Sequence, residues 1–78
     1  MSKVIIYTTP TCVYCKMAKN YFTEHHIAYE EKNVATDLEA REEMVRKSEQ
    51  LGVPVIDVDG EIVIGFDQER LARLLKIM

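Results

Sequence analysis

Two cysteines, Cys12 and Cys15, are the residues whose type and spacing most directly suggest chemistry in this chain. Two residues separate them, Pro10 precedes them, and a run of good helix formers follows them. Such a pair can close a short disulfide, bind a metal ion or exchange electrons with another disulfide. The spacing alone leaves all three uses open.

The position of the pair relative to the expected elements favours redox chemistry. The apolar run at residues 4–7 predicts a buried strand, and the next helix, expected over residues 13–25, begins just after Cys12. The free amides and the positive dipole end of a helix stabilise a thiolate at that position. We therefore expect Cys12 to attack a substrate disulfide as the nucleophile, and Cys15 to resolve the mixed disulfide by forming a bond with Cys12.

The two other uses of the pair have weaker support. A disulfide across a four-residue loop would stabilise the fold by only about 2 kcal/mol by the loop-entropy relation. Zinc needs two further ligands, and at about 1.5 Å of helix per residue His25 and His26 lie about 15 Å beyond Cys15. We therefore expect no metal site within one chain. The alternative function is a binding module with little turnover, in which two chains share a metal ion or an iron-sulfur cluster.

Composition and charge indicate one small globular domain that spans residues 1–78. Hydrophobic residues make up 47% of the chain and charged residues 29%, without a repeat or a low-complexity segment. A net charge of -3 with mixed signs predicts neither a nucleic-acid partner nor a membrane partner. A pair of cysteines in so small a chain, and an N-terminal apolar run too short for a signal peptide, are typical of a cytoplasmic protein. We expect it to be a monomer.

Strand and helix patterns alternate along the chain. Strands are expected at residues 4–7, 27–34, 53–58 and 61–64, and helices at residues 13–25, from 36 and from 67. Asp59-Gly60 is a two-residue hairpin signal between the last two strands. A helical crossover should place the second strand parallel to the first, which then lies centrally. The sequence therefore predicts an α/β fold with a four-stranded mixed sheet and three helices, in the order β-α-β-α-β-β-α.

Caps and apolar spacing give the limits and the buried faces of the helices. Thr36 and Glu39 have the form of a capping box, so the second helix should begin there and stop near Gly52. Asp67 should cap the last helix. The apolar positions of that helix are Leu71, Leu74, Leu75 and Met78. In the first helix, spacings of three and four residues predict a face on the sheet formed by Tyr14, Ala18, Tyr21, Phe22 and His25.

These features together resemble the glutaredoxin family, which has the thioredoxin fold, and especially its short glutaredoxin-like redoxins of the NrdH type. The similarity covers essentially the whole chain. The segments that carry it are Tyr7-Thr8, Cys12-Val13-Tyr14-Cys15, Gly52-Val53-Pro54 and Asp59-Gly60. The resemblance implies a dithiol-disulfide oxidoreductase that reduces protein disulfides and holds no bound cofactor.

The resemblance also implies a substrate-binding edge beside the thiols. Pro54 is expected to follow a cis peptide bond, and Val53 to offer its backbone amide and carbonyl to an extended substrate. Further substrate-binding positions are expected at Thr11, Tyr14, Phe66 and Asp67. Three of these have alternative interpretations: inward packing for Tyr14, a lid on the core for Phe66 and an ordinary helix cap for Asp67.

Departures from the family pattern bear on the electron source. Glutaredoxins that use glutathione carry a lysine at the position of Thr9, a proline at that of Val13, and two glycines at those of Ile64 and Gly65. Several glutathione contacts are therefore expected to be altered here. The resemblance favours an upstream dithiol reductase of the thioredoxin-reductase type, with glutathione as the alternative reducing co-substrate.

Charged side chains near the two cysteines could influence their reactivity. Lys16 and Lys19 are expected on a solvated helix face, with extra positive charge near Cys12 as the alternative. Thioredoxins carry a buried acid at the position held here by Ile6. We therefore expect no proton uptake by a carboxylate at that position.

Overall fold

The computed structural model describes residues 3–50 and 52–76, and in them the four strands and three helices follow the predicted order. The strands are β1 (Val4–Thr8), β2 (Glu30–Asn33), β3 (Val55–Val58) and β4 (Glu61–Ile64). The helices are α1 (Val13–Glu24), α2 (Leu38–Ser48) and α3 (Gln68–Leu75). The sheet has the strand order β2-β1-β3-β4, in which β1 and β2 are parallel and the other neighbours antiparallel. The predicted α/β fold with a mixed sheet is confirmed.

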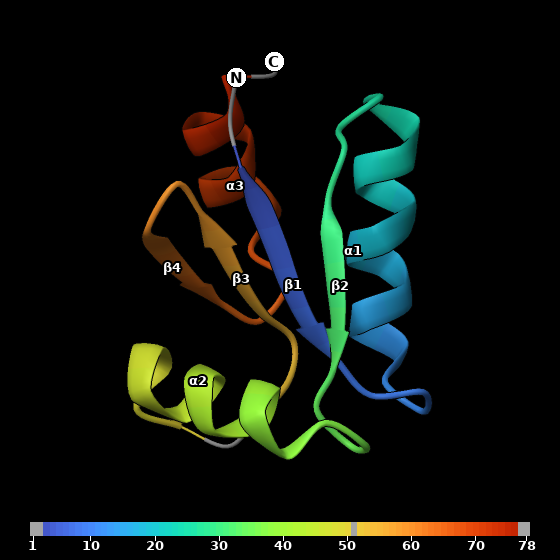
Figure 1. Ribbon diagram of the computed structural model, residues 1–78. Helices are drawn as coiled ribbons and strands as arrows, with labels where there is room; N and C mark the ends of the chain where they lie inside the picture. Colours follow the sequence, from blue (N-terminus) through green and yellow to red (C-terminus); the bar gives the residue numbers. More distant parts are fainter. Residues whose placement is uncertain (1–2, 51, 77–78) are drawn as a thin grey trace.

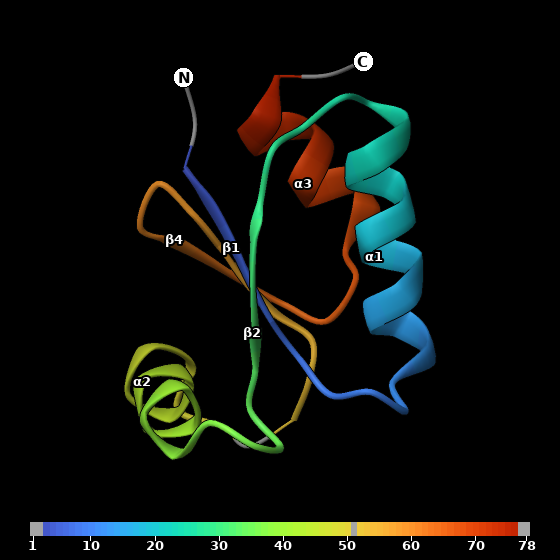
Figure 2. The same cartoon turned by 45° about the vertical axis from the view of Figure 1, so that its right-hand side comes forward.

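The helices cover both faces of the sheet. α1 and α3 lie on one face and α2 lies on the other (Figures 1 and 2). Successive side chains of a strand point to opposite faces, so Ile6 of β1 packs on the side of α1 and α3, whereas Tyr7 packs on the side of α2. Every residue of β1 is buried, which explains why this central strand is a continuous apolar run.

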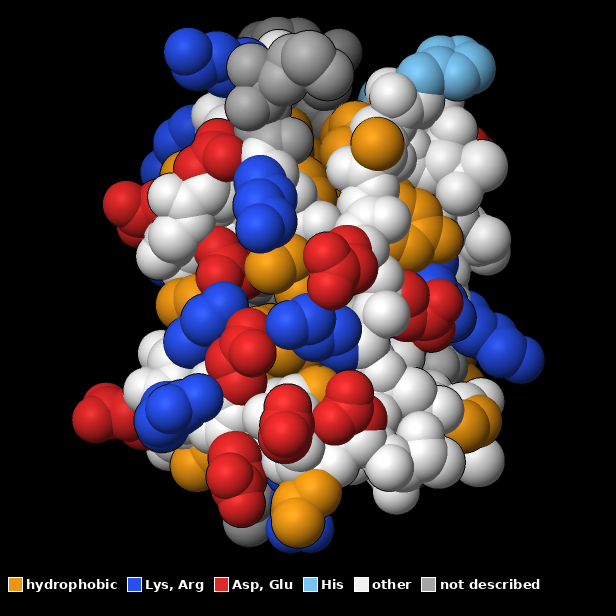
Figure 3. All heavy atoms as spheres, in the orientation of Figure 1, with side chains coloured by type: hydrophobic (Ala, Val, Ile, Leu, Met, Phe, Trp, Pro, Cys, Tyr) orange, Lys and Arg blue, Asp and Glu red, His pale blue; other side chains and the backbone are white. Residues whose placement is uncertain are grey.

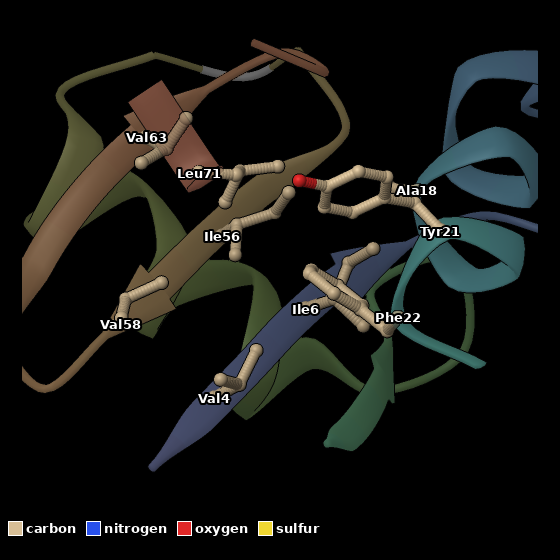
Figure 4. Packing of buried hydrophobic residues seen from close by; sticks show 9 residues of the cluster. All are labelled: Val4, Ile6, Ala18, Tyr21, Phe22, Ile56, Val58, Val63 and Leu71. Atoms are coloured by element: carbon tan, nitrogen blue, oxygen red, sulfur yellow. The ribbon is translucent and has the colours of Figure 1, made fainter. Parts of the chain in front are cut away.

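One core cluster fills the space between the sheet and the helices α1 and α3. Ala18 and Phe22 of α1 and Leu71 of α3 meet Ile6 and Ile56 of the sheet (Figure 4). All five side chains are fully buried. Burial of a large apolar side chain stabilises a fold by about 1.5–3 kcal/mol. This packing fixes α1 on the sheet and so positions its first turn, where the two cysteines lie.

The buried face of α1 differs from the prediction at two positions. Tyr14 is 62% exposed, and His25 is an exposed C-cap residue that contacts Tyr21 with 4.6 Å between ring centroids. The buried stripe begins instead at Cys15, one residue and about 100° around the helix from Tyr14. Helical spacing alone does not show how far the sheet extends beneath the ends of a helix.

The N-terminus of α2 lies one residue beyond the predicted cap. Asp37 is the N-cap, and its carboxylate accepts a hydrogen bond from the amide of Ala40 at 3.1 Å. Thr36 belongs to the preceding turn, because the carbonyl of Asn33 accepts the amides of both Thr36 and Asp37. The capping-box prediction for Thr36 is therefore wrong.

Several elements are shorter than predicted. α2 ends at Ser48, before the predicted stop at Gly52, because Glu49 adopts the left-handed conformation with a φ of 60°. β2 begins at Glu30 and not at residue 27, since the amide of Ile27 donates to the carbonyl of Phe22 and closes the end of α1. β3 begins at residue 55 instead of 53. The predicted apolar position Met78 lies outside the described residues.

Two local predictions at the C-terminal half are confirmed. Asp59 and Gly60 have φ values of 52° and 93°, as a two-residue hairpin of the primed type requires. The amide of Gly60 donates to a carboxylate oxygen of Asp57 at 2.7 Å, which supports the turn. Asp67 caps α3 by accepting the amide of Arg70 at 3.2 Å.

A network of polar side chains joins α2 to the sheet. The hydroxyl of the fully buried Tyr7 donates to the carboxylate of Glu43, and Lys47 donates to that hydroxyl at 2.9 Å and to Asp57 at 2.7 Å. The hydrogen bond from Tyr7, with those from Lys47 and Lys32, lowers the pKa of Glu43 to about 2. Figure 3 shows acidic and basic side chains interspersed on this side of the molecule. Within the network of Tyr7, Glu43, Lys47 and Asp57, the charged groups are partners of one another.

Candidate active site

Cys12 is the N-cap residue of α1. Its backbone is extended, with a φ of -83° and a ψ of 114°, and its Sγ accepts a hydrogen bond from the amide of Cys15 at 3.1 Å. The amide of Cys12 donates to the carbonyl of Thr9 at 3.3 Å, within the connection between β1 and α1. The partly exposed sulfur thus lies at the positive end of the helix dipole, with a helix amide directed at it.

Cys15 has the opposite environment in the first turn of α1. Its side chain is fully buried, and like Cys12 it is a free thiol. Burial raises the pKa of Cys15 to about 12, and the hydrogen bond and charge of Cys12 act in the same direction. A backbone hydrogen bond with Thr9 and the charge of Lys19 lower this pKa, but by less. The pair is therefore asymmetric, with one partly exposed cysteine and one fully buried cysteine.

Strand connectivity brings the other predicted site residues to the same end of the sheet (Figure 1). Tyr7 of β1 lies opposite Val55 of β3, which in turn lies opposite Ile64 of β4. Because these pairs are antiparallel, the segment after β1, the segment before β3 and the segment after β4 meet at one end. Those segments contain the predicted residues Thr11, Cys12, Val53, Pro54, Phe66 and Asp67.

The peptide bond between Val53 and Pro54 is cis, as the family resemblance implies. Pro54 is buried and Val53 is half-buried. The carbonyl of Pro54 accepts the amide of Gly65 at 2.8 Å and so joins the segment before β3 to the end of β4. On the other side of this end, Thr11 and Tyr14 are exposed beside Cys12 in sequence.

The fold itself uses Phe66 and Asp67. The ring of Phe66 packs edge-on against Tyr21, with 5.7 Å between the ring centroids, and covers the core cluster. Asp67 is the N-cap of α3. The structure thus supports the lid interpretation for Phe66 and the cap interpretation for Asp67, and a substrate-binding role for either residue stays a prediction.

Sequence reasoning missed one polar cluster near the thiols. Lys19 of α1 donates to the carboxylate of Glu31 at 2.8 Å, and the buried hydroxyl of Thr8 donates to the same carboxylate at 2.9 Å. The prediction of a solvated helix face for Lys19 does not include these contacts. Strand alternation contains the missing signal, because Thr8 lies on the same face as Ile6, and Ile6 pairs with Glu31 in the parallel register.

Within residues 3–50 and 52–76, no group of three or more His, Cys, Asp or Glu side chains is arranged to hold a metal ion. None of the helices in these residues is long and apolar enough to cross a membrane.

Sequence comparison identifies the family. Residues 4–63 match the family model described as Glutaredoxin. This chain belongs to the glutaredoxin family. It is 45% identical over 71 residues to an uncharacterized glutaredoxin-like 8.6 kDa protein in the rubredoxin operon of Clostridium pasteurianum, with 91% of this chain and 95% of that protein covered. It is 35% identical over 74 residues to the glutaredoxin-like protein NrdH of Lactococcus lactis, with 91% and 97% covered.

Solved structures agree with this assignment. A variant of a thioredoxin-like protein superposes with a TM-score of 0.93 at 35% identity, over 100% of both chains. The NrdH-redoxin of Escherichia coli superposes with a TM-score of 0.81 at 28% identity, over 92% of this chain and 93% of that one. As a member of the glutaredoxin family, this protein is a thiol-disulfide oxidoreductase, of a class that needs no prosthetic group.

Proposed function

We propose that this protein reduces disulfides in other proteins through Cys12 and Cys15. The thiolate of Cys12 attacks a substrate disulfide, forms a mixed disulfide and releases one substrate thiolate, which takes up a proton. Cys15 then loses its proton and attacks the Sγ of Cys12. The second substrate thiolate leaves, and the two cysteines, now oxidised, are joined by a disulfide.

The asymmetry of the two sulfurs is the observation that supports these roles. Cys12 is accessible, and its sulfur accepts a helix amide, which stabilises negative charge on a nucleophile and on a leaving group. Cys15 is enclosed and its pKa is raised, so it is unsuited to the first attack on a bulky substrate. The amide of Cys15 donates to the Cys12 sulfur at 3.1 Å, so Cys12 caps the same helix turn that contains Cys15, and the second attack is intramolecular.

The substrate-binding edge in this proposal is formed by Val53 and Pro54, with Thr11 and Tyr14 on the other side of Cys12. Connectivity supports it, since the segments before β3 and after β1 meet at one end of the sheet. The exposure of Thr11 and Tyr14 leaves both side chains free to face a docked polypeptide. An extended substrate segment there would use backbone hydrogen bonds for affinity and side-chain contacts for selectivity. Phe66 and Asp67 follow β4 at the same end and would border the substrate.

The proposed electron source is a cytoplasmic dithiol reductase of the thioredoxin-reductase type, with glutathione as the alternative. Thr9 lacks the cation that glutathione-using relatives carry at this position. Ile64 lies on the edge strand β4 and is 52% exposed, at a position where those relatives have glycine. A branched side chain there obstructs the approach of a small peptide to the backbone.

The burial of Cys15 argues against the alternative of a metal or iron-sulfur cluster shared between two chains. A cluster bound by all four thiolates needs both thiolates of each chain to reach the partner chain. Cys15 is fully buried in the first turn of α1, which keeps its sulfur away from the surface. Metal content and the absorption spectrum of the purified protein test this point directly.

Reduction of insulin disulfides tests the proposed activity. Wild-type protein is expected to turn over with thioredoxin reductase and NADPH, and more slowly with glutathione and glutathione reductase. Cys12→Ser is expected to abolish turnover with either source, while circular dichroism verifies that the fold persists. A folded wild-type protein that leaves insulin oxidised with both electron sources would overturn the proposal.

A further inference from the structure

The polar cluster beside the thiols has no role in the steps proposed above. It consists of Lys19 of α1, Glu31 of β2 and Thr8 of β1. Glu31 is its centre, since one carboxylate oxygen accepts from the Lys19 ammonium at 2.8 Å and from the Thr8 hydroxyl at 2.9 Å. The Lys19 side chain is only 27% exposed. The ammonium is therefore held by the sheet.

Helix geometry places Lys19 on the same face of α1 as the buried thiol. Cys15 and Lys19 are four residues apart on α1, so they share one face, and their Cβ atoms are about 5–6 Å apart. Long side chains in a helix lean back toward its N-terminus. For Lys19 this is the direction of Cys15. Beneath them, β1 presents Ile6 and Thr8 on this face, and neither carries a charge.

We infer that Lys19 is a positioning residue that stabilises the thiolate of Cys15 while this thiol resolves the mixed disulfide, with Glu31 and Thr8 holding the ammonium in place. The inference rests on the proposed roles of Cys12 and Cys15. The proton of Cys15 leaves to solvent, the new bond forms between the sulfurs of Cys15 and Cys12, and the substrate thiolate departs with the electron pair of the broken bond. Lys19 supplies charge and exchanges neither protons nor electrons.

The pKa directions agree with this arrangement. The charge of Lys19 lowers the pKa of Cys15, whereas burial, the strongest influence, and Cys12 raise it. Conversely, the hydrogen bond to Glu31 raises the pKa of Lys19, and the charges of Glu31, Tyr29 and Cys15 act in the same direction. These are the titratable groups that act on the pair from α1, its N-cap and the β2 side of the sheet.

The size of the effect follows from the exposure of Lys19 and from its bond to Glu31. An opposite charge close to a titratable group shifts its pKa by about 1–3, and the partial exposure of Lys19 and its bond to Glu31 favour the lower end, about 1. Loss of the charge then reduces the thiolate fraction of Cys15 about tenfold. A thiolate of higher pKa is a better nucleophile, and with a Brønsted slope of about 0.5 a pKa rise of about 1 increases its reactivity about threefold. The two effects together lower the resolving rate about threefold.

Reaction with the aromatic disulfide DTNB separates the two steps. The first thionitrobenzoate is released when Cys12 attacks, and the second when Cys15 resolves. Lys19→Met is expected to slow the second release about threefold at neutral pH. The pH dependence of that release should shift to higher pH by about 1 pH unit. Lys19→Arg keeps the charge and should restore most of the rate. Lys16→Met, which removes an exposed lysine of the same turn, is the matched control and should leave the second release unchanged.

Glu31→Gln distinguishes charge from packing. Its amide oxygen still accepts from Thr8 and Lys19, but the negative charge is gone, so the second release should be as fast as in the wild type or faster. Equal slowing in Glu31→Gln and Lys19→Met would show a structural role and overturn the inference. So would a normal second release in folded Lys19→Met. Failure of the wild type to release the first thionitrobenzoate would instead refute the proposed function.

Discussion

Glu43→Gln tests the polar network that joins α2 to the sheet. The carboxylate of Glu43 accepts from Tyr7 and is bound by Lys47 at 3.1 Å and by Lys32 at 3.3 Å. Glutamine has nearly the same shape and still accepts a hydrogen bond from Tyr7. The variant therefore removes the charge and keeps the packing. Its loss in free energy of unfolding measures how much the ionised carboxylate of Glu43 contributes to stability.

The magnitude follows from the pKa of Glu43, which the network lowers from 4.5 to about 2. At about 1.36 kcal/mol per pKa unit this difference corresponds to at most about 3.4 kcal/mol. The side chain is 28% exposed, so solvent screening reduces the expected loss to about 1.5–2 kcal/mol. In a domain of this size such a loss lowers Tm by about 6–16 °C.

The pH dependence has a definite sign. Because the pKa of Glu43 is lower in the folded state, its contribution is complete above the ordinary glutamate pKa and is lost as the pH falls through about 2. More than half of it is lost by about pH 3. The difference in stability between the wild type and Glu43→Gln should therefore shrink from pH 7 to pH 3.

Urea unfolding at both pH values, followed by circular dichroism, measures this difference. Glu42→Gln is the matched control, since it makes the same substitution at the exposed neighbouring position of α2. It is expected to change stability by less than about 0.5 kcal/mol. An equal loss at pH 7 and pH 3 in Glu43→Gln, or a loss no larger than that of Glu42→Gln, would refute the reasoning.

Further predictions concern electron source, capping and packing. The double variant Thr9→Lys with Ile64→Gly should raise glutathione-coupled turnover, because it restores a charge-assisted bond worth up to about 10- to 150-fold in affinity and an open backbone. An unchanged rate would exclude those contacts. Asp67→Ala should lower the free energy of unfolding in urea by about 1 kcal/mol, because it removes the cap of α3. Asp67→Asn keeps a capping oxygen without the charge and is the control; an equal loss in both variants would contradict the capping role. Phe22→Ala should cost about 3–5 kcal/mol by emptying the core beneath α1, and a thermal scan that shows less than about 1 kcal/mol would contradict its burial.

The sequence was sufficient where a local rule determines the structure. The Asp59-Gly60 hairpin was predictable because few residue pairs accept two positive φ angles. The place of Cys12 at the start of α1 followed from an apolar strand, a short connection and a run of helix formers. Both features depend on residues that are close together in the sequence, so hydrophobic periodicity and turn preferences are enough to predict them.

Features that depend on distant partners were not predictable in the same way. The bond between Lys19 and Glu31 requires the parallel register of β1 and β2, which the sequence does not state. Such contacts join elements far apart in the chain, and their identity follows only from the assembled sheet.

Trapping of the mixed disulfide tests the central claim, that Cys12 attacks and Cys15 resolves. Cys15→Ser and Cys12→Ser are each incubated with an excess of a disulfide substrate, and intact mass and peptide mapping locate any adduct. The account predicts that Cys15→Ser accumulates one adduct, on Cys12, and that Cys12→Ser remains free of adduct because Cys15 is enclosed. Adducts of equal yield in both variants, or an adduct on Cys15 at the wild-type rate of attack, would contradict it.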